Sequence, residues 1–284
     1  MLGRNRLNGR SPAEIRLMRS AGLVVARALA AVEAALRPGV TTRELDAVAE
    51  EVIRSAGAVP SFKGYHGFPA SICVSVGDEV VHGIPGERVL AAGDLVSVDC
   101  GAILQGWHGD AARSWIVPGG PDGEAAAAQA ALLEDTRTAM WAAIAALRER
   151  GPLHAIGDTI EEHVARCEEE RGLRYGIVEE YGGHGIGREM HEDPWIPNYA
   201  ARGSGGRVPR GLTVAIEPMI TLGEPETRTL ADDWTVVTTS GRAAAHWENT
   251  VAVTEGGVWV LTEPDGGESG LAELGGRCAP LSDS

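Results

Sequence analysis

The chain has 284 residues, of which 44% are hydrophobic, and a formal net charge of −15 at pH 7. That charge argues against a nucleic-acid partner, because phosphates are repelled wherever a local basic patch is missing. The sequence contains no run of about 18 apolar residues and no signal-peptide stretch, and its four cysteines show no CxxC spacing. We therefore predict a cytoplasmic protein without membrane contact.

Two helices are predicted at the start of the chain. A capping box at Ser11 and Glu14 begins a segment whose apolar residues recur at helical spacing as far as Leu36. A second capping box, at Thr41 and Glu44, begins another amphipathic segment that ends near residue 57. Both segments have the start signals and the apolar stripe of surface helices.

The rest of the chain alternates between strand and helix patterns. The predicted elements are strands within 71–117, helices at 124–150 and 158–171, and strands at 212–221, 235–237, 243–254 and 258–262. This order favours two similar α+β halves packed into one domain of residues 11–263. Residues 1–10 are expected to be a flexible N-terminus, and the Gly-, Ser- and Glu-rich residues 264–284 a mobile tail.

Two aspartates share one face of a predicted hairpin. If Gln105–Gly106 is a two-residue turn, Asp110 lies opposite Gly101 and diagonal to Asp99, with the glycine leaving room between the carboxylates. A buried carboxylate must be paired, protonated or bound to a cation. Two on one face favour a cation, although a protonated or solvated pair at a sheet edge stays an open alternative.

The second half of the chain supplies further metal-binding side chains. Glu217 follows an apolar strand and precedes Pro218, which confines it to an edge or bulge, and Glu248 also adjoins an apolar strand. The stretch GGHGIGREMHEDP is too rich in glycine for a helix, so His184 can approach such carboxylates closely. We expect the four carboxylates at or near strand ends. Four carboxylates and one imidazole suit two cations about 3.5–4 Å apart.

These motifs together resemble type I methionine aminopeptidases of peptidase family M24, over residues 11–262. The resemblance rests on GYHGFPASICVS, VVHGIP, VSVDCGA, HGDAARSW, GGHGIGREMHEDP, AIEPM and WENTVAVT. It implies the pita-bread fold, an α+β fold in which two pseudo-symmetric halves form a curved antiparallel sheet covered by helices. The implied activity is hydrolytic removal of the initiator methionine from nascent proteins and peptides with a small second residue, through a hydroxide bound to two metal ions.

The resemblance also implies which residues bind the metal ions. The implied ligands are Asp99, Asp110, His184, Glu217 and Glu248. Asp110 and Glu248 would bridge two divalent ions, and Co, Mn, Fe or Zn all suit carboxylate and imidazole ligands. Glu217 would in addition take and relay the proton of the attacking water.

Substrate contacts are implied in the same way. His82 would contact the scissile amide nitrogen and His191 would stabilise the oxyanion. The implied lining of the methionine pocket is Tyr65, Phe68, Cys73, Met190 and Trp234. Without the resemblance, most of these pocket residues would be interpreted as ordinary core. The implied partners are N-terminal methionine peptides and nascent chains, with transient ribosome contact, and the expected state is a monomer.

Two other functions are compatible with parts of this pattern. Aminopeptidase P and prolidase resemble the chain in ligands and fold, but they usually carry a further N-terminal domain, which roughly 60 residues before the HGFP motif cannot hold. A non-catalytic pita-bread binding protein predicts missing ligands, and none is missing.

Two residues depart from the family pattern. Asn249 stands where the family usually has His, and strand alternation points it away from the metal face, so we expect a packing change. Met190 stands where some members have Phe. Of the remaining histidines, His108 is interpreted as a neighbour of the ligands, and His154 and His163 as solvated helix residues.

Overall fold

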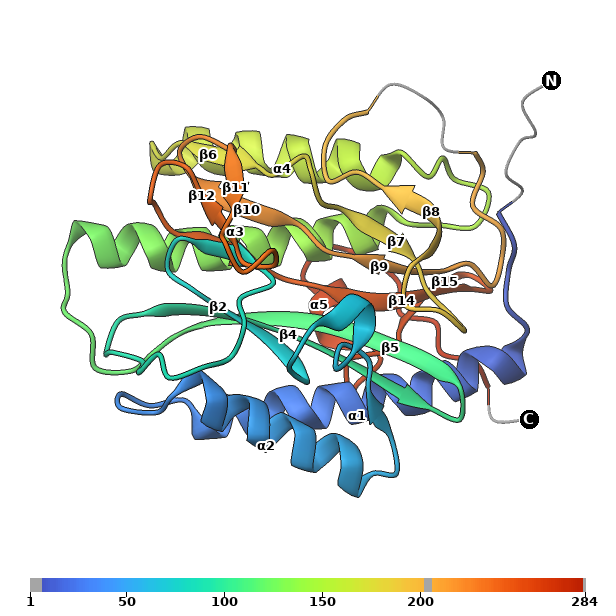
Figure 1. The fold of residues 1–284 in the computed structure, drawn as a ribbon. Coiled ribbons are helices and arrows are strands. Elements are labelled where there is room, and N and C mark those ends of the chain that lie inside the picture. Colours follow the sequence, from blue (N-terminus) through green and yellow to red (C-terminus); the bar gives the residue numbers. More distant parts are fainter. Residues whose placement is uncertain (1–6, 202–205, 283–284) are drawn as a thin grey trace.

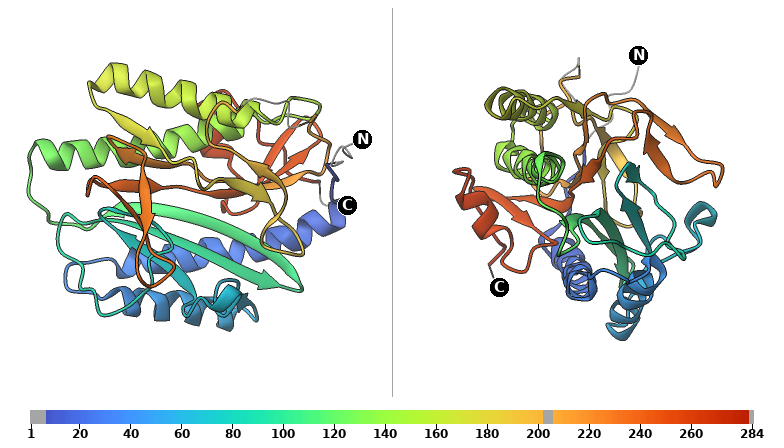
Figure 2. Two further views of the ribbon diagram at one scale, coloured as in Figure 1. Left: turned by 45° about the horizontal axis from the view of Figure 1, so that its top comes forward. Right: turned by 90° about the vertical axis from the view of Figure 1, so that its left-hand side faces the viewer.

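The helices lie in two pairs, with the strands between them (Figure 1). The structure is a computed structural model that describes residues 7–201 and 206–282. Helices α1 (Pro12–Ala35) and α2 (Thr42–Ser55) cover one side, and α3 (Glu124–Ala146) and α4 (Ala155–Arg171) cover the other. Figure 2 shows the same two layers of helices on opposite sides of the strands. The expectation of flexibility over residues 1–10 falls largely outside the described residues.

The first two helices begin where their capping boxes predict. The Ser11 hydroxyl accepts a hydrogen bond from the Glu14 amide at 3.4 Å, and the Glu14 carboxylate accepts from the Ser11 amide at 2.8 Å. Thr41 and Glu44 make the same reciprocal pair at 3.2 and 2.8 Å. These bonds satisfy amide groups that a helix N-terminus otherwise leaves without partners.

The N-terminal half contains one four-stranded antiparallel sheet. Its strands are β1 (Val59–Pro60), β2 (Ile72–Val76), β4 (Leu95–Leu104) and β5 (Trp107–Ile116). The turn between β4 and β5 is the predicted Gln105–Gly106, and both residues have positive φ, at 53° and 75°. Asp110 consequently pairs with Gly101, and Asp99 with Ala112, so the predicted register is confirmed.

The remaining strands form three antiparallel sheets. The five-stranded sheet has the order β15 (Gly257–Val260), β14 (Asn249–Thr254), β9 (Thr213–Ile216), β7 (Gly183–Gly185) and β8 (Glu192–Ile196). One three-stranded sheet joins β13 (Ala244–His246), β10 (Met219–Leu222) and β6 (Tyr175–Ile177). The other joins β11 (Thr227–Thr229), β12 (Val236–Thr238) and β3 (Glu79–Val81).

Several element boundaries differ from the sequence prediction. Helix α4 begins at Ala155, so Asp158 lies in its first turn and is not its N-cap, and α3 ends at Ala146 instead of 150. The predicted strands 212–221 and 243–254 are each two strands, interrupted before Pro218 and at Glu248. Each interruption transfers the chain from one sheet to another, and each holds one of the predicted glutamate ligands.

Residues 264–282 differ from the mobile tail that their composition predicts. Helix α5 (Glu268–Ala272) packs near Trp141 of α3, because Gly270 has no side chain to separate them. Farther on, Arg16 donates to the carbonyl oxygen of Ser282 at 2.6 Å. The C-terminal segment is thus fixed against both helical layers.

The core has two main parts, one under each pair of helices. Residues of α1 and α2 pack on β2, β4 and β5, and residues of α3 and α4 pack on β9, β10 and β14. None of the helices in the described part of the chain has both the length and the apolar character needed to cross a bilayer. The strands between these cores position the polar residues described next.

Candidate metal centre and substrate pocket

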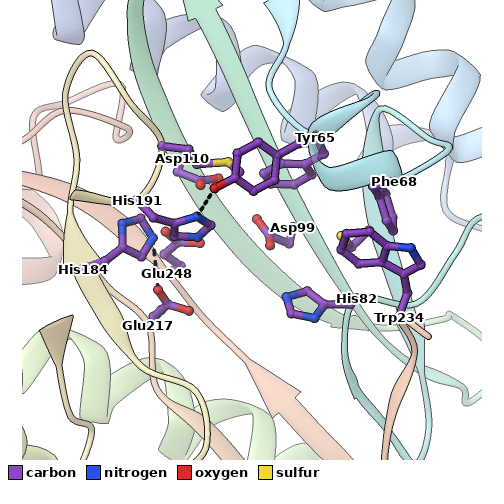
Figure 3. A pocket seen from close by; sticks show the side chains of 13 residues that line it. Tyr65, Phe68, His82, Asp99, Asp110, His184, His191, Glu217, Trp234 and Glu248 are labelled. Atoms are coloured by element: carbon purple, nitrogen blue, oxygen red, sulfur yellow. Dashed lines mark hydrogen bonds and ion pairs between the residues drawn. The ribbon is translucent and has the colours of Figure 1, made fainter. Parts of the chain in front are cut away.

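The five predicted ligands converge on one pocket between the two halves of the chain (Figure 3). They are Asp99 on β4, Asp110 on β5, His184 on β7, Glu217 after β9 and Glu248 before β14. Ligand atoms of Asp110, His184 and Glu248 all lie within 4.8 Å of one another. The expectation that every carboxylate lies near a strand end is wrong for the aspartates, which occupy the middle of β4 and β5.

Hydrogen bonds between the two halves hold Glu248 beside Asp110. The backbone amide and carbonyl of Glu248 pair with those of Ala112, at 3.0 and 3.3 Å. The Thr250 hydroxyl accepts from the Asp110 amide at 3.0 Å and donates to its carbonyl at 2.8 Å. Because β5 and the start of β14 belong to different halves, the ligand set is complete only when both halves are folded together.

Gly101 makes room for a segment of the first half of the chain. A side chain at this position would meet that segment at close range. Its Cβ would lie 2.8 Å from the Cβ of Ser61 and 2.9 Å from the ring of Phe62. Gly101 therefore lets the segment before the HGFP motif lie close on β4, which brings Phe62 to the pocket.

The pKa values of the clustered carboxyl groups are all raised. Burial raises the pKa of Asp110 to about 7, and burial together with neighbouring carboxylates raises the pKa of Asp99, Glu217 and Glu248 well above the usual range. Like charges held out of water disfavour the ionised form unless a cation offsets them. This electrostatic arrangement is what a binding site for divalent cations requires.

Unpartnered oxygens test whether a cation fits these residues. Asp99 Oδ1, Asp110 Oδ1 and Glu248 Oε1 are buried and make no hydrogen bond. The guanidinium of Arg113 donates to the side chains of Asn249 and Glu263. Buried carboxylate oxygens without donors are costly in an apolar interior, and oxygen ligands of this kind suit Mn, Fe, Co and Zn. The residues present therefore fit divalent metal ions.

The imidazole of His184 is oriented for the same purpose. Its Nδ1 lies 2.9 Å from the carbonyl oxygen of Gly185, so Nδ1 carries the proton and Nε2 presents a lone pair. Nε2 lies 3.3 Å from Glu217 Oε1. Burial and the neighbouring His191 lower the pKa of His184 to about 4, so the ring is neutral at pH 7, as a ligand must be.

The whole pocket has a volume of about 140 Å³, and aromatic and apolar side chains form one end of it. Its lining includes the predicted Tyr65, Phe68, Cys73, Met190 and Trp234. The rings of Phe68 and Trp234 meet edge to face with centroids 5.1 Å apart. Phe62 also lines the pocket and was missed, since in the sequence nothing distinguishes it from a core residue.

Two further histidines face the carboxylates. His82 adopts a left-handed backbone with φ of 61°, and burial lowers its pKa to about 4. The ring of His191 lies 4.3 Å from that of His184, and its Nδ1 is 2.9 Å from the hydroxyl of Tyr65. Both were predicted to be near the ligands, and both line the pocket.

One histidine beside the ligands was not identified as a site residue. His246 is buried, and its Nε2 has no hydrogen-bond partner and lies 3.9 Å from Glu217 Oε2. Strand alternation placed it on the face of Glu248, which is the signal that could have found it. Burial and the neighbouring His82 lower the pKa of His246 to about 3.

Other polar residues lie outside the ligand set. Nδ1 of His108 lies 3.1 Å from the Ser61 hydroxyl. His163 is not a solvated helix residue as predicted, because it is buried between α3 and α4 and its ring nitrogens contact Thr138 at 2.9 Å and Arg166 at 2.7 Å. All four cysteines are free, as expected.

Asn249 points away from the metal face, as strand alternation predicts. Its side-chain oxygen accepts from Thr262 at 2.7 Å and from Arg113 at 2.9 Å. Its amide nitrogen faces Met140 and Glu263. Asn249 therefore belongs to the packing between β14, α3 and the C-terminal segment.

Comparisons with known proteins point to one family. Residues 16–255 match the model of metallopeptidase family M24. The chain is 51% identical over 261 residues to methionine aminopeptidase 1 of Mycobacterium tuberculosis (strain CDC 1551 / Oshkosh), covering 92% of the chain and 96% of the relative. It is 44% identical over 253 residues to methionine aminopeptidase 1 of Bacillus subtilis (strain 168), covering 89% and 98%. The crystal structure of methionine aminopeptidase from Thermotoga maritima matches with a TM-score of 0.83 at 39% identity, covering 91% of the chain and all of that structure.

Proposed function

The chain belongs to metallopeptidase family M24 as a methionine aminopeptidase of the pita-bread fold that removes the initiator methionine, and we propose that it does so with two divalent cations. The observation that carries this proposal is the set of three buried carboxylate oxygens without partners beside the lone pair of His184. Five ligands with four carboxylates exceed what one tetrahedral ion needs and suit a pair of ions. The residues that would hold the cations are Asp99, Asp110, His184, Glu217 and Glu248.

The proposed reaction is hydrolysis of the first peptide bond. Bound cations would supply a water molecule of lowered pKa and polarise the scissile carbonyl. Glu217 is the proposed proton acceptor, because its carboxylate lines the pocket beside the other ligands, with Oε1 at 3.3 Å from His184 Nε2. That proton then passes to the leaving amine.

Two histidines are proposed to act on the substrate directly. We propose that the Tyr65 hydroxyl, 2.9 Å from Nδ1 of His191, donates to that nitrogen, so that the Nε2–H of His191 donates to the developing oxyanion. His82 is proposed to contact the scissile amide nitrogen. The low pKa of each imidazole keeps it neutral at pH 7, so each can donate one hydrogen bond without adding charge.

Specificity for methionine is proposed to come from the apolar end of the pocket. A thioether packs favourably against aromatic rings, and Phe68 and Trp234 offer two of them edge to face. Met190 and Cys73 complete this apolar wall, and neither side chain needs a strong hydrogen bond from the substrate. A preference for a small second residue is proposed from the family resemblance.

The setting of the reaction is proposed as well. We place the protein in the cytoplasm as a monomer that acts on nascent chains with transient ribosome contact, and four free cysteines fit a reducing compartment. One catalytic domain is proposed over residues 11–263. The native ion is proposed to be whichever of Mn, Fe, Co or Zn the cell makes available.

Hydrolysis of Met-Ala-Ser and Ala-Pro-Ala by metal-stripped protein tests this proposal. With Mn(II), Fe(II) or Co(II) restored, the wild type should release methionine from Met-Ala-Ser, and Glu217→Ala should not. Cleavage confined to Ala-Pro-Ala would identify an Xaa-Pro aminopeptidase. Binding of metal without turnover of either peptide would favour a binding protein.

A further inference from the structure

A second hollow adjoins the catalytic pocket. It has a volume of about 400 Å³ and is lined by Gly182, His184, His191, Glu192, Asp193 and Trp195. His184 and His191 line both the hollow and the catalytic pocket, so the two spaces meet at this pair of rings. The volume falls within the range of about 300–1,000 Å³ that is typical of ligand sites. Nothing in the reaction proposed above uses this hollow.

Trp195 is the feature of the hollow that most needs an explanation. It lies on edge strand β8 directly opposite His184 on β7, so both side chains stand on the same face of the sheet. Its indole is 52% exposed, although most large apolar side chains of the described residues are buried. An exposed tryptophan beside a reactive centre is typical of a surface that a ligand covers.

Gly182 shapes the hollow on the side of the indole. A Cβ at this position would lie 3.3 Å from Nε1 of Trp195 and 2.6 Å from the carbonyl oxygen of Ile196. The absence of a side chain therefore lets the indole rest against the backbone of the neighbouring strand. The ring is supported in this position before any ligand arrives, which lowers the entropy that binding would cost.

The catalytic pocket has a direction that leads toward this hollow. In Figure 3, Phe68 and Trp234 lie on one side of Asp99, and His184 and His191 lie on its other side, beside Glu248. A methionine side chain at the apolar end puts the scissile bond at the carboxylates. The residues that follow the bond must then leave the pocket, and the second hollow is the neighbouring space that shares His184 and His191 with it.

We propose that this hollow binds the substrate chain beyond its second residue, with Trp195 packing against the third and fourth side chains. The inference rests on the proposed function and adds a second specificity site to it. Apolar or aromatic side chains are the favoured occupants, because they bury the indole.

The test compares two substrates of different length, Met-Ala amide and Met-Ala-Leu-Tyr amide, on metal-loaded protein. Trp195→Ala should lower the ratio of kcat/KM for the longer peptide over the shorter by about tenfold, mainly through KM, and Trp195→Phe should restore most of the ratio. Val89→Ala removes an apolar side chain that is 58% exposed outside the hollow, and it should leave the ratio unchanged. Thermal unfolding of each variant checks that the fold is retained.

The outcomes separate this inference from the proposed function. An unchanged ratio in Trp195→Ala, or equal losses on both peptides, would overturn the role of the hollow while leaving the aminopeptidase activity established. Failure of the wild type to release methionine from Met-Ala amide would count against the proposed function itself. A selective loss on the longer peptide supports both.

Discussion

Glu217 stands at a break between two strands, where Pro218 prevents β9 from continuing. Its carboxylate is the proposed proton acceptor, and general base catalysis contributes about 10²- to 10⁴-fold to a rate. Glu217→Gln should therefore lower kcat for Met-Ala-Ser by at least about 100-fold. Glu255→Gln is a matched control, because that carboxylate is exposed and pairs with Arg210 at 2.9 Å. Near-normal turnover by Glu217→Gln would remove the residue from the mechanism.

Asp135 makes a separate prediction about stability. Its carboxylate is 3% exposed and accepts hydrogen bonds from Arg171 at 2.6 and 2.7 Å and from the Tyr175 hydroxyl at 2.7 Å. Arg171 is 42% exposed and can be solvated once the pair is broken, so the main cost is the buried Tyr175 hydroxyl left without its acceptor, about 1–3 kcal/mol. Asp135→Ala should lower the free energy of unfolding in urea by that order.

The neighbouring Glu134 provides the control for this prediction. It pairs with Arg137 on the surface of the same helix at 2.8 Å, and exposed pairs contribute about 0–1 kcal/mol. Glu134→Ala should therefore change the unfolding midpoint little. Equal losses of unfolding free energy in the two variants would show that Asp135 does not stabilise the packing of α3, α4 and β6.

Single residues also show which functional positions could be predicted. Asp99 and Asp110 were found because a charged residue is conspicuous in an apolar strand, and two-residue periodicity fixed their faces. Phe62 and His163 were not recognised, because burial depends on packing between segments that the sequence does not place. Strand alternation puts His246 on the face of Glu248 but does not give its distance from Glu217, which depends on how two different sheets meet.

Helix α1 crosses strand β5 at a point where two glycines meet. A Cβ on Gly22 would lie 2.2 Å from the carbonyl oxygen of Leu261, and a Cβ on Gly109 would lie 2.6 Å from the amide nitrogen of Gly22. Gly22→Ala should therefore destabilise the protein, because overpacking costs about 1–3 kcal/mol and outweighs the gain of about 1 kcal/mol in helix propensity. Ser20→Ala on the exposed side of α1 is the control and should be close to neutral. Increased thermal stability of Gly22→Ala would show that the crossing can relax.

Elements with local signals were predicted well, and their ends less so. The helices at Pro12–Ala35 and Thr42–Ser55 and the hairpin turn at Gln105–Gly106 have capping boxes and turn residues that act within a few positions. The start of α4 was wrong because Asp158 resembles a cap but lies within the first turn. The breaks at Pro218 and Glu248 could not be placed, since they depend on which sheet each half-strand joins.

At the scale of the whole molecule, the carboxylate cluster opposes folding when no metal is bound. Burial raises the pKa of Asp110 to about 7, against about 3.9 in an unfolded chain. The folded state then binds more protons than the unfolded state between these values, so this group's contribution to stability falls as pH rises from about 4 to 7. Metal-stripped wild type should lose stability relative to metal-stripped Asp110→Asn over this range.

Melting temperatures from pH 4.5 to 7.5 check this sign. Other titrating groups contribute equally to both proteins and cancel in the comparison. Glu50 is an example: its pKa is lowered to about 2, so its contribution to stability rises with pH. Adding Mn(II) at pH 7.5 should raise the melting temperature of the wild type more than that of Asp110→Asn. If the melting temperatures of the two metal-stripped proteins change with pH in the same way, the buried carboxylate cluster does not oppose folding.

The general architecture could be predicted from the sequence, but the pairing of distant strands could not. The order of helices and strands indicated two α+β halves, and the motifs indicated the pita-bread fold. Strand β3 pairs with β12, which lies more than a hundred residues later, and no short-range pattern encodes that contact. The C-terminal residues were interpreted as a tail because their contacts with α1 and α3 are equally distant in sequence.

We propose that five side chains, contributed by both halves of the chain, bind two cations. Crystals of the protein soaked with Mn(II), with anomalous diffraction recorded near the manganese edge, test it most directly. We expect two anomalous peaks about 3.5–4 Å apart, both within coordination distance of Asp110 and Glu248. A single peak, or no peak among these carboxylates, would contradict it.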